Sequence, residues 1–340
     1  MKKFYTLFAL LVIAAMALPA CAPAAPNCAD EQTFCVGLVT DVGKIDDKSF
    51  NQSAWEGVQK AKNELGAIVN YIETTDSKDY DKNISTFADE GYDVIVTVGF
   101  GMGDATAAAA AKYPNVKFIG VDQFQGETIA NVAGLIFPED NAGFLVGALA
   151  AMMTKTGKIG SVLGTDVVPP VWRFGEGYRA GAAYINPDVE VFVVYHSDVG
   201  FDKTFTDPEW GAQTANAMIA QGADVIFGAG GKTGNGAVEA AAQAGVYAIG
   251  VDTDQYYTLP NAAPRLLSSA TKEITAGVFD LLKLAKEGKF PSGNYLGAAG
   301  YAPYHDLENE VPAEVKARME EINAKLLSGE LKTNVPPAKP

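Results

Sequence analysis

The sequence has little positive charge and very little arginine. Its 340 residues include 26 Lys and Arg against 41 Asp and Glu, a formal net charge of -15, and only four of the basic residues are arginines. Nucleic acids and anionic membrane surfaces attract basic patches, so this balance argues against either as a partner. Because arginine is the usual bidentate clamp for phosphate, a phosphate-rich ligand is also less expected.

Histidine is nearly absent, with only His196 and His305. A multi-histidine metal site is therefore not expected, a histidine-based catalytic centre has few candidates, and we expect no cofactor. Apolar residues, in contrast, are plentiful: 48% of the chain is hydrophobic and 20% is charged. Such a composition excludes global disorder, and the length fits about two domains at ~150 residues each.

The first 20 residues have the layout of an export signal. Two lysines precede an almost wholly apolar run, Phe4–Leu18, that is too short and too early for a transmembrane span. Leu18-Pro19-Ala20-Cys21 then resembles a bacterial lipobox, in which the cysteine is lipidated and becomes the mature N-terminus. We therefore predict a signal peptide over 1–20, a lipid on Cys21, and an exported protein anchored to the outer side of the cell membrane. The alternative is ordinary signal-peptidase cleavage, with Cys21 incidental.

Residues 21–33 would then form the lipidated cysteine and a tether that is rich in Ala and Pro. Cys28 and Cys35 are the other cysteines, with six residues between them. Because export permits oxidation, we predict that they form a small disulfide that ties the N-terminus down. The alternative is two free thiols, and we assign neither cysteine a catalytic role.

The body of the chain alternates short apolar runs with helical patterns. Trp55, Val58 and Ala61 are spaced for one face of a helix, and Asp207-Pro208 is typical of an N-cap followed by an N1 proline. This alternation predicts an α/β fold of doubly wound parallel sheets, in which ligands bind beyond the carboxyl ends of the strands. The predicted strands are Cys35–Thr40, Ala67–Ile72, Asp93–Val98, Val116–Val121, Lys158–Leu163, Val189–Tyr195, Asp224–Gly228 and Val246–Val251; further helices are predicted near 79–90, 104–113, 139–154, 173–185, 232–244, 272–287 and 312–327.

Two segments repeat the same order of features. A strand that begins at Asp93 leads through a glycine turn and an alanine-rich helix to Ile-Gly-Val-Asp ending at Asp122, and a strand that begins at Asp224 leads the same way to Asp252. We therefore predict two similarly built domains, with Asp122 and Asp252 at equivalent strand ends that face a cleft. Chance similarity of two α/β units is the alternative.

Glycine-rich loops follow two of the predicted strands. Gly230-Gly231-Lys232-Thr233 fails the phosphate-loop pattern because Ile226 stands where that pattern requires glycine, and Gly99–Asp104 fails the dinucleotide fingerprint at its last position. Both loops still open helices, so their backbone N–H groups could approach a ligand, and Gly230 and Gly231 are candidate contacts. The alternative is that these glycines only allow tight turns.

The segment Thr40–Gln52 combines an aromatic ring, amides and carboxylates. It leaves the first strand and enters a helix, so it should lie at the mouth of the cleft. A planar heterocycle needs an aromatic ring to stack on and an acid or amide to read its edge, so we favour a binding role for Asp41 and Phe50. For Asp46 and Asp47 we favour a solvated helix start instead.

The run TDVGKIDDKSFNQSAWEG, residues 40–57, closely resembles the opening motif of the basic membrane protein family. These are substrate-binding lipoproteins of ABC transporters and include purine nucleoside receptors of the PnrA-like type. The resemblance continues in order through FIGVDQ, DNAGFLVGALAA, GADVIFGAGGKTGNGA, IGVDTDQ and SSATKE, across essentially the whole mature chain. It implies a type I periplasmic-binding-protein fold: two α/β lobes joined by three crossovers, with a ligand trapped by hinge closure.

The resemblance also implies how the ligand is held. Asp41 and Asn51 would read the edge of a purine base, and Phe50 would stack on it. A second aromatic plate would come from the other lobe, and Phe227 is the candidate.

The sugar would be held by a second set of residues. By the same resemblance Asp122 and Asp252 would bind ribose hydroxyls and Lys272 would reach the sugar. Carboxylates accept strongly from vicinal hydroxyls, and a lysine compensates a cluster of buried acids. Trp172, Arg173 and Phe174 follow Pro169-Pro170 at another strand-to-helix turn and would line the cleft from the second lobe; for Trp172 a packing role is the alternative.

Three crossovers imply split domains: 34–137 plus 271–300 for the first lobe, 138–270 plus 301–330 for the second, and a tail over 331–340. We expect a monomeric binding protein that captures a purine nucleoside, such as adenosine, guanosine or inosine, and delivers it to an ABC permease without chemistry. One alternative is a binding protein for a sugar or another small polar metabolite. Another is an exported nucleoside hydrolase that uses Asp41, Asp46 and Asp47.

Overall fold

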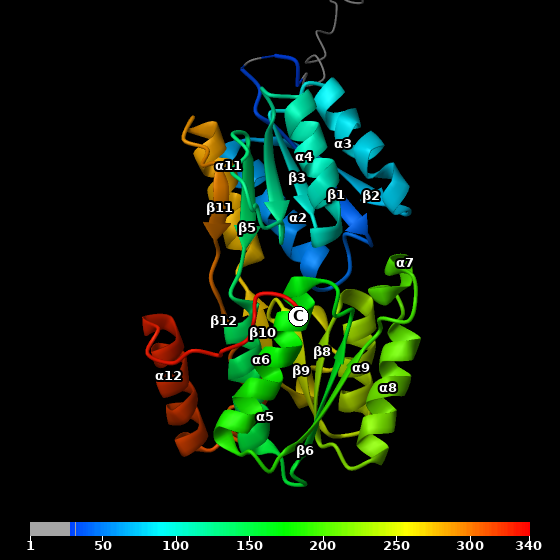
Figure 1. The fold of residues 1–340 in the computed structure, drawn as a ribbon, viewed down its shortest axis with the longest axis vertical. Coiled ribbons are helices and arrows are strands. Elements are labelled where there is room, and N and C mark those ends of the chain that lie inside the picture. Colours follow the sequence, from blue (N-terminus) through cyan, green and yellow to red (C-terminus); the bar gives the residue numbers. More distant parts are fainter. Residues whose placement is uncertain (1–27, 31) are drawn as a thin grey trace, which may run out of the picture.

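The computed structural model describes residues 28–30 and 32–340. The predicted signal peptide, the lipidation site Cys21 and most of the tether lie outside the described residues. The described chain forms two α/β lobes, one above the other in Figure 1, and each lobe is built around its own sheet.

The first lobe has a six-stranded sheet with all pairings parallel and the order β11-β5-β4-β3-β1-β2. Its elements are β1 (Cys35–Val42), α2 (Phe50–Leu65), β2 (Ile68–Thr74), α3 (Tyr80–Asp89), β3 (Val94–Val98), α4 (Gly103–Lys112), β4 (Lys117–Val121), β5 (Val132–Ile136), α11 (Ile274–Lys286) and β11 (Gly293–Leu296). Helices α2 and α11 cover one face of this sheet, and α3 and α4 cover the other. Both faces of β1 are therefore buried: Val36 and Leu38 pack under α2, while Cys35 and Val39 pack under α3.

The second lobe has a six-stranded sheet of order β12-β10-β9-β8-β6-β7, in which β12 alone runs antiparallel to its neighbour. Its elements are α5 (Glu139–Met153), β6 (Lys158–Leu163), α6 (Pro169–Ile185), β7 (Glu190–Tyr195), α7 (Phe201–Thr204), α8 (Pro208–Ala220), β8 (Val225–Ala229), α9 (Gly231–Gln243), β9 (Tyr247–Asp252), α10 (Gln255–Thr258), β10 (Leu266–Lys272), β12 (Ala299–Tyr301) and α12 (Ala313–Ser328). Helices α5, α6 and α12 cover one face, and α8 and α9 cover the other.

The two sheets share one strand order, which confirms the doubly wound prediction and the internal repeat. The first lobe runs β2-β1-β3-β4-β5 and the second runs β7-β6-β8-β9-β10. Strand β10 was missed because its sequence carries Ser268 and Ser269, whose hydroxyls are buried and hydrogen-bonded, Ser268 to the Ala302 carbonyl at 2.7 Å and Ser269 to the Gln255 N–H at 3.1 Å. Strands β5, β11 and β12 were also missed; β11 and β12 have only four and three residues, whereas β5, with five, is as long as β3 and β4.

The chain passes between the lobes three times: after β5, after β10, and between β11 and β12. Strand β10 still pairs with β12 at Lys272, opposite Ala299. Residues 271–272 and 299–300 therefore belong to the second sheet, whereas the predicted boundaries assigned them to the first lobe. The three crossing segments lie side by side along one edge of the molecule (Figure 1).

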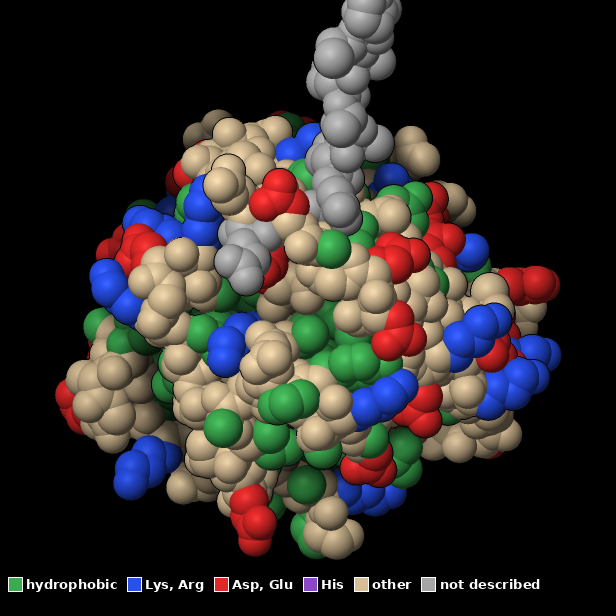
Figure 2. All heavy atoms as spheres, turned by 90° about the horizontal axis from the view of Figure 1, so that it is seen from above, with side chains coloured by type: hydrophobic (Ala, Val, Ile, Leu, Met, Phe, Trp, Pro, Cys, Tyr) green, Lys and Arg blue, Asp and Glu red, His purple; other side chains and the backbone are tan. Residues whose placement is uncertain are grey.

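Within the described part of the chain, no helix is both long and apolar enough to cross a membrane. The end face of the first lobe, seen in Figure 2, carries acidic and basic side chains interspersed over its surface. Four acids among the described residues, in contrast, are buried: Asp47, Asp122, Glu139 and Asp252.

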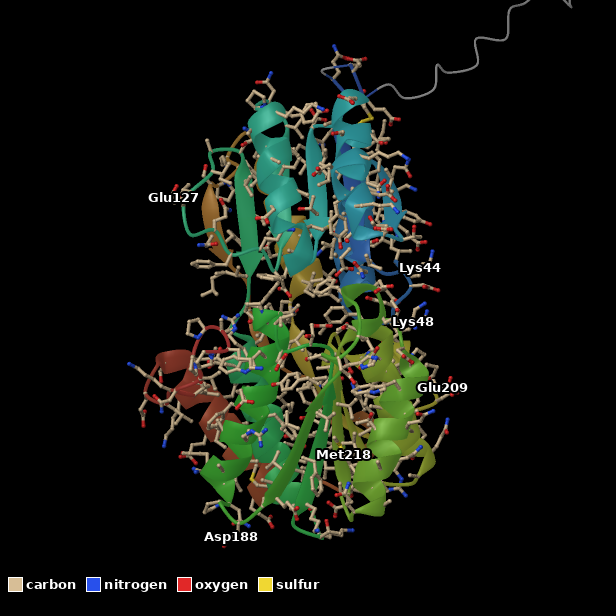
Figure 3. The ribbon with its side chains drawn as sticks, turned by 45° about the vertical axis from the view of Figure 1, so that its right-hand side comes forward. Lys44, Lys48, Glu127, Asp188, Glu209 and Met218 are labelled. Carbon is tan, nitrogen blue, oxygen red and sulfur yellow. A yellow bond between two sulfur atoms is a disulfide. The ribbon has the colours of Figure 1, made fainter. Side chains whose placement is uncertain are left out.

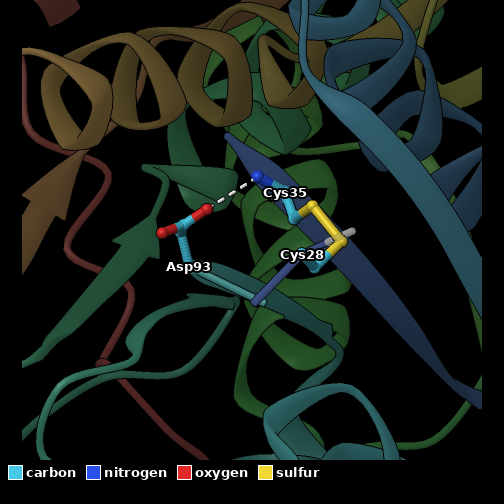
Figure 4. Close-up of a disulfide and its surroundings, with 3 residues drawn as sticks. All are labelled: Cys28, Cys35 and Asp93. Atoms are coloured by element: carbon cyan, nitrogen blue, oxygen red, sulfur yellow. Dashed lines mark hydrogen bonds between the residues drawn. A yellow bond between two sulfur atoms is a disulfide. The ribbon is translucent and has the colours of Figure 1, made fainter. Parts of the chain in front are cut away.

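The first described residues are fastened to the amino end of β1. Cys28 and Cys35 form the predicted disulfide, with Cα atoms 5.6 Å apart, and Asp93 Oδ2 accepts a hydrogen bond from the Cys35 N–H at 2.7 Å (Figure 4). Since Cys35 is the first residue of β1, the disulfide lies at the end of the sheet opposite the carboxyl ends of its strands.

Replacing Cys28 by Ser should destabilise the first lobe without changing ligand affinity. Removing the ring that spans seven positions frees the unfolded chain, which should cost up to about 2.5 kcal/mol in the free energy of unfolding. Denaturant titration measures this, and the oxidised wild-type protein treated with a reductant should lose the same amount. A variant as stable as the oxidised protein would contradict the prediction.

Candidate functional site

A cavity of about 450 Å³ lies between the lobes, at the carboxyl ends of both sheets. Each lobe contributes the loops that follow its central strands. The first lobe lines the cavity with Asp41, Asp47, Phe50, Asn51, Gly99 and Asp122, and the second lines it with Phe174, Phe205, Gly230, Gly231, Asp252 and Lys272.

Lys272 is the centre of a buried charge cluster in this cavity. Its Nζ lies 2.6 Å from Asp122 Oδ2, 3.6 Å from Asp252 Oδ1 and 3.8 Å from Glu139 Oε1. All four side chains are almost wholly buried. Lys272 is the last residue of β10, where the chain crosses between lobes, so one ammonium group compensates acids from both sides of the cleft.

Asp122 and Asp252 occupy equivalent positions, as the internal repeat predicts. Asp122 follows β4 and Asp252 ends β9, and both have left-handed backbones, with φ of 59° and 64°. Aspartate is one of the few non-glycine residues that adopts this conformation readily. The repeat therefore extends to the backbone turn that directs each carboxylate into the cavity.

Glu139 is part of the cluster and was not predicted. It opens α5 just after the first crossing, is 1% exposed, and contacts the guanidinium of Arg173. Arg173 also donates to the Phe137 carbonyl at 2.6 Å, and burial lowers its pKa. In the sequence Glu139 looks like an ordinary first-turn acid, so only the tertiary structure reveals that it is paired.

Asp41 and Asn51 form a polar pair at the end of β1. Asn51 Nδ2 donates to Asp41 Oδ1 at 3.2 Å. Burial raises the pKa of Asp41 to about 7, the bond from Asn51 opposes this, and the nearby charges of Asp47 and Asp122 raise it further. Asp41 therefore lies near the midpoint of its titration at neutral pH and can accept or donate a hydrogen bond.

Among the residues that line the cavity, two buried acceptor atoms have no hydrogen-bond donor in the described part of the chain. They are Asn51 Oδ1 and Asp122 Oδ1, and both are buried. A buried acceptor without a partner costs roughly 1–3 kcal/mol, so buried polar atoms in folded proteins are nearly always paired. A ligand whose N–H or O–H groups donate to these two oxygens would therefore gain the most binding free energy.

Asp47 is buried, which corrects the prediction of a solvated helix start. It is 4% exposed and accepts from the backbone N–H groups of Ser49, Asn51 and Gln52 at 3.0, 2.9 and 3.1 Å. Its carboxylate thus satisfies free donors at the start of α2. Burial raises the pKa of Asp47 to about 6. Asp46 is exposed, as predicted, with its nearest cation, Lys232 Nζ, at 3.4 Å.

Phe227 and Trp172 do not line the cavity, so neither is the second aromatic plate in this structure. Phe227 is the third residue of β8 and points into the core, where its ring stacks on Tyr178 with centroids 5.3 Å apart. Trp172 lies in α6, is 7% exposed and is not among the residues that line the cavity. Successive side chains point to opposite faces of a strand and to different sides of a helix. A shift of one residue therefore moves a side chain from the cavity to the core.

The aromatic rings that do line the cavity are Phe50 and Phe100 from the first lobe and Phe174, Phe201 and Phe205 from the second. Lys272 Nζ lies 4.7 Å from the ring centroid of Phe50 and 5.7 Å from that of Phe174. Phe174 is 2% exposed and packs against Phe227, with centroids 6.2 Å apart. Phe205 lies in the loop before α8 and is only partly buried, so it has more free ring surface to offer.

The glycines of both loops have packing reasons that support the tight-turn alternative. Gly99 has φ of 114°, and a Cβ there would come within 2.6 Å of Asp41 Oδ2. Gly230 has φ of 150°, and a Cβ there would meet the Gly164 nitrogen at 2.6 Å. Because Gly230 and Gly231 also line the cavity, close backbone approach to a ligand remains open to them. No group of three or more His, Cys, Asp or Glu side chains in the described ranges is arranged to hold a metal ion.

The chain resembles known binding proteins along most of its length. Residues 34–298 match the model of a family described as ABC transporter substrate-binding protein PnrA-like. The chain is 33% identical to a CD4+ T-cell-stimulating antigen of Listeria monocytogenes, over 90% of this chain and 89% of that one. It is 34% identical to the ABC transporter nucleoside-binding protein BmpA of Lactococcus lactis, over 75% of this chain and 76% of that one.

A solved structure shares the fold. An ABC transporter solute-binding protein from Aeropyrum pernix matches with a TM-score of 0.78 and 28% identity, over 88% of this chain and 92% of that one. The predicted type I fold of periplasmic solute-binding proteins is therefore confirmed.

Replacing Asp41 by Asn should make the ligand-free protein more stable at alkaline pH. A carboxyl group whose pKa is raised on folding stabilises the fold fully below its unfolded value of 3.8, and this contribution is lost as the pH rises through about 7. Asparagine stays neutral throughout, so the variant should melt at a higher temperature than wild type at pH 8, with a smaller difference at pH 5. Thermal melts at both values test this; an equal difference at both would refute it.

Proposed function

The chain belongs to the PnrA-like family of ABC transporter substrate-binding proteins, and we propose that the ligand it captures is a purine nucleoside. The observation that carries this proposal is the pair of buried acceptors without donors, Asn51 Oδ1 and Asp122 Oδ1, in one cavity with the ring of Phe50. A nucleoside combines the matching parts: N–H groups on a flat base, and O–H groups on a sugar. The volume of about 450 Å³ lies in the range of small-molecule sites.

The base would lie against Phe50, with its edge toward Asp41 and Asn51. Purine edges present both donors and acceptors. Asn51 offers one of each, and Asp41, with a pKa of about 7, takes the protonation state that the edge requires. Since Phe227 is in the core, we propose Phe205 as the second plate, because it lines the cavity from the other lobe and has exposed ring surface.

The ribose would lie at Lys272, Asp122 and Asp252. Vicinal hydroxyls can donate to both carboxylates, and the sugar ring oxygen or a hydroxyl can accept from the lysine. Trp172 does not line the cavity and is left out of this arrangement. The backbone of Gly230 and Gly231 completes the wall.

The charge of the cavity favours a nucleoside over a nucleotide. Asp47, Asp122, Asp252 and Glu139 are buried in or beside it and Asp41 is half-buried, whereas Lys272 is the buried cation and Arg173 lies beside it. Lys44, Lys203 and Lys232 also line the cavity, but they are more exposed to solvent. A phosphate would meet excess negative charge in a poorly solvated space, where like charges repel strongly.

Function follows from closure of the two lobes. Ligand contacts from both lobes favour the closed form, and that form would dock on the permease. We propose an exported monomer that is anchored through Cys21 and does no chemistry on its ligand. A sugar remains a second candidate, because the Asp and Lys set suits any polyol. A nucleoside hydrolase is less well supported, because Asp46 points to solvent and does not converge with Asp41 and Asp47.

Stacking makes a testable contribution to affinity. Phe50→Ala and Phe205→Ala should each weaken inosine binding by at least ~1 kcal/mol through lost stacking, measured by titration calorimetry. Phe227→Leu is the matched control: it should lower the melting temperature and leave the affinity unchanged. If Phe50→Ala titrates like wild type, Phe50 is not in the site, and if Phe227→Leu alone weakens binding, the original assignment of Phe227 is restored.

Retention of a nucleoside distinguishes the three functions. We expect mass spectrometry of small molecules carried through purification to detect a purine nucleoside, and incubation with inosine to return it intact at one equivalent per protein. Release of free hypoxanthine would support the hydrolase, and recovery of a sugar would support the second candidate.

A further inference from the structure

The loop Asp46–Ser49 of the first lobe is bonded directly to the second lobe. The Lys48 carbonyl accepts two hydrogen bonds from α10: from Gln255 Nε2 at 3.1 Å and from Thr258 Oγ1 at 2.8 Å. Figure 3 shows Lys48 at the level where the two lobes meet. Beside it, Ser49 Oγ donates to Asp252 Oδ2 at 2.6 Å.

Asn235 on α9 extends this contact into a chain of amides. Its Nδ2 donates to the Asp47 carbonyl at 2.7 Å, and its Oδ1 accepts from Gln255 Nε2 at 2.8 Å. Gln255 Oε1 in turn accepts from the Val251 N–H at 3.1 Å. Both amide side chains are buried, at 7% and 0% exposure, and their polar atoms are used. The loop is thus held mainly by a completed buried network, and one exposed pair across the lobes, Lys232 Nζ with Asp46 Oδ1 at 3.4 Å, adds to it.

These bonds do not involve the residues that would hold the ligand, with one exception. Asn235, Gln255 and Thr258 are not among the residues that line the cavity, and only the bond from Ser49 ends on a lining side chain, Asp252. The contact can therefore form whether or not a ligand is present.

The internal repeat shows that this reach across the cleft is specific to the second lobe. Gln123 packs on Gly120, and Gln255 packs on Gly250 in the same way. A Cβ added to Gly120 would come within 2.3 Å of Gln123 Oε1, and one added to Gly250 within 2.4 Å of Gln255 Oε1. Gln123 Nε2, however, donates to the Thr97 and Gly99 carbonyls of its own lobe, both at 3.1 Å. One glutamine of the pair ties its own lobe together, and the other ties the two lobes to each other.

The backbone of Lys48 indicates that the contact is formed under constraint. Lys48 has φ of 64°, a left-handed conformation that an ordinary side chain disfavours. Such conformations persist where the surroundings over-determine them. The two hydrogen bonds to the Lys48 carbonyl hold Lys48 in this conformation, and they exist only while the lobes are together.

We propose that the loop Asp46–Ser49 is an interlobe latch, and that Asn235, Gln255 and Thr258 are the positioning residues that hold it, so that part of the population closes before any ligand binds. The latch also holds Asp47 and the start of α2, with Phe50 and Asn51, against the cavity. Bound ligand leaves only when the latch opens, so the latch slows dissociation more than it affects association. It rests on the hinge closure of the proposed function but not on the identity of the ligand.

A distance measurement in the ligand-free protein tests the latch directly. Spin labels at Lys82 in α3 and Glu209 in α8, exposed positions on the two lobes, should give a short and a long distance in wild type, with Cys28–Cys35 left oxidised. Thr258→Val removes one interlobe bond at the surface and should raise the ratio of open to closed molecules about five-fold, and Asn235→Ala should raise it about ten-fold or more. A saturating ligand such as inosine should restore the short distance in both.

The matched control is Asn131→Ala. Asn131 is also a buried asparagine, but its Nδ2 donates to the Ala110, Tyr113 and Val116 carbonyls within the first lobe. This variant should lose stability and keep the wild-type distances. Stopped-flow binding of inosine should show faster dissociation for Asn235→Ala and Thr258→Val, with the association rate raised only as far as the open fraction of the ligand-free protein rises.

The outcomes separate the latch from the proposed function. A ligand-free wild type with only the long distance, or variants with unchanged distances, would overturn the latch. A shift in Asn131→Ala equal to that in Asn235→Ala would overturn it too, because general destabilisation would explain both. If wild type does not bind inosine but the distances shift as expected, the latch stands and the nucleoside assignment fails.

Discussion

The structure depends on one buried ammonium group between carboxylates of two lobes. Lys272 Nζ lies 2.6 Å from Asp122 on the first lobe and 3.6 Å from Asp252 on the second. Charges removed from water are tolerated only when they are paired, so these groups require one another. Lys272 ends a strand where the chain crosses between the lobes. When the lobes come together, its ammonium group therefore meets the buried acids of both. A neutral ligand fits this arrangement because it supplies donors without disturbing the charge balance.

Much of the fold was readable in the sequence, because buried parallel strands are continuous apolar runs and the repeat places Asp122 and Asp252 at equivalent ends. Errors arose where tertiary contacts decide the outcome. Strand β10 is hidden by two serines whose hydroxyls find partners only in the fold, and Glu139 looks like a surface acid until Arg173 is beside it. Phe227 has the right composition and position, but strand alternation turns its ring into the core.

The two lobes share a strand order, a turn and a strand-end aspartate, yet they use their shared parts differently. Gln123 bonds within its own lobe, whereas Gln255 bonds across the cleft. Likewise the first lobe presents Asp41 and Asn51, which have no counterpart pair at the matching end of β6, where Leu163 is followed by Gly164 and Thr165. The repeat thus gives the cavity two similarly built sides. The residues proposed for ligand recognition and for interlobe bonding are those in which the two lobes differ.

The disulfide at Cys28 and Cys35 has a mechanical consequence. It joins the chain to the amino end of β1, at the far end of the first lobe from the cleft. Any pull on the preceding chain enters the first lobe through a covalent ring and does not reach the three crossings. An anchor on the preceding chain would therefore hold the first lobe still and leave the second lobe to swing against it.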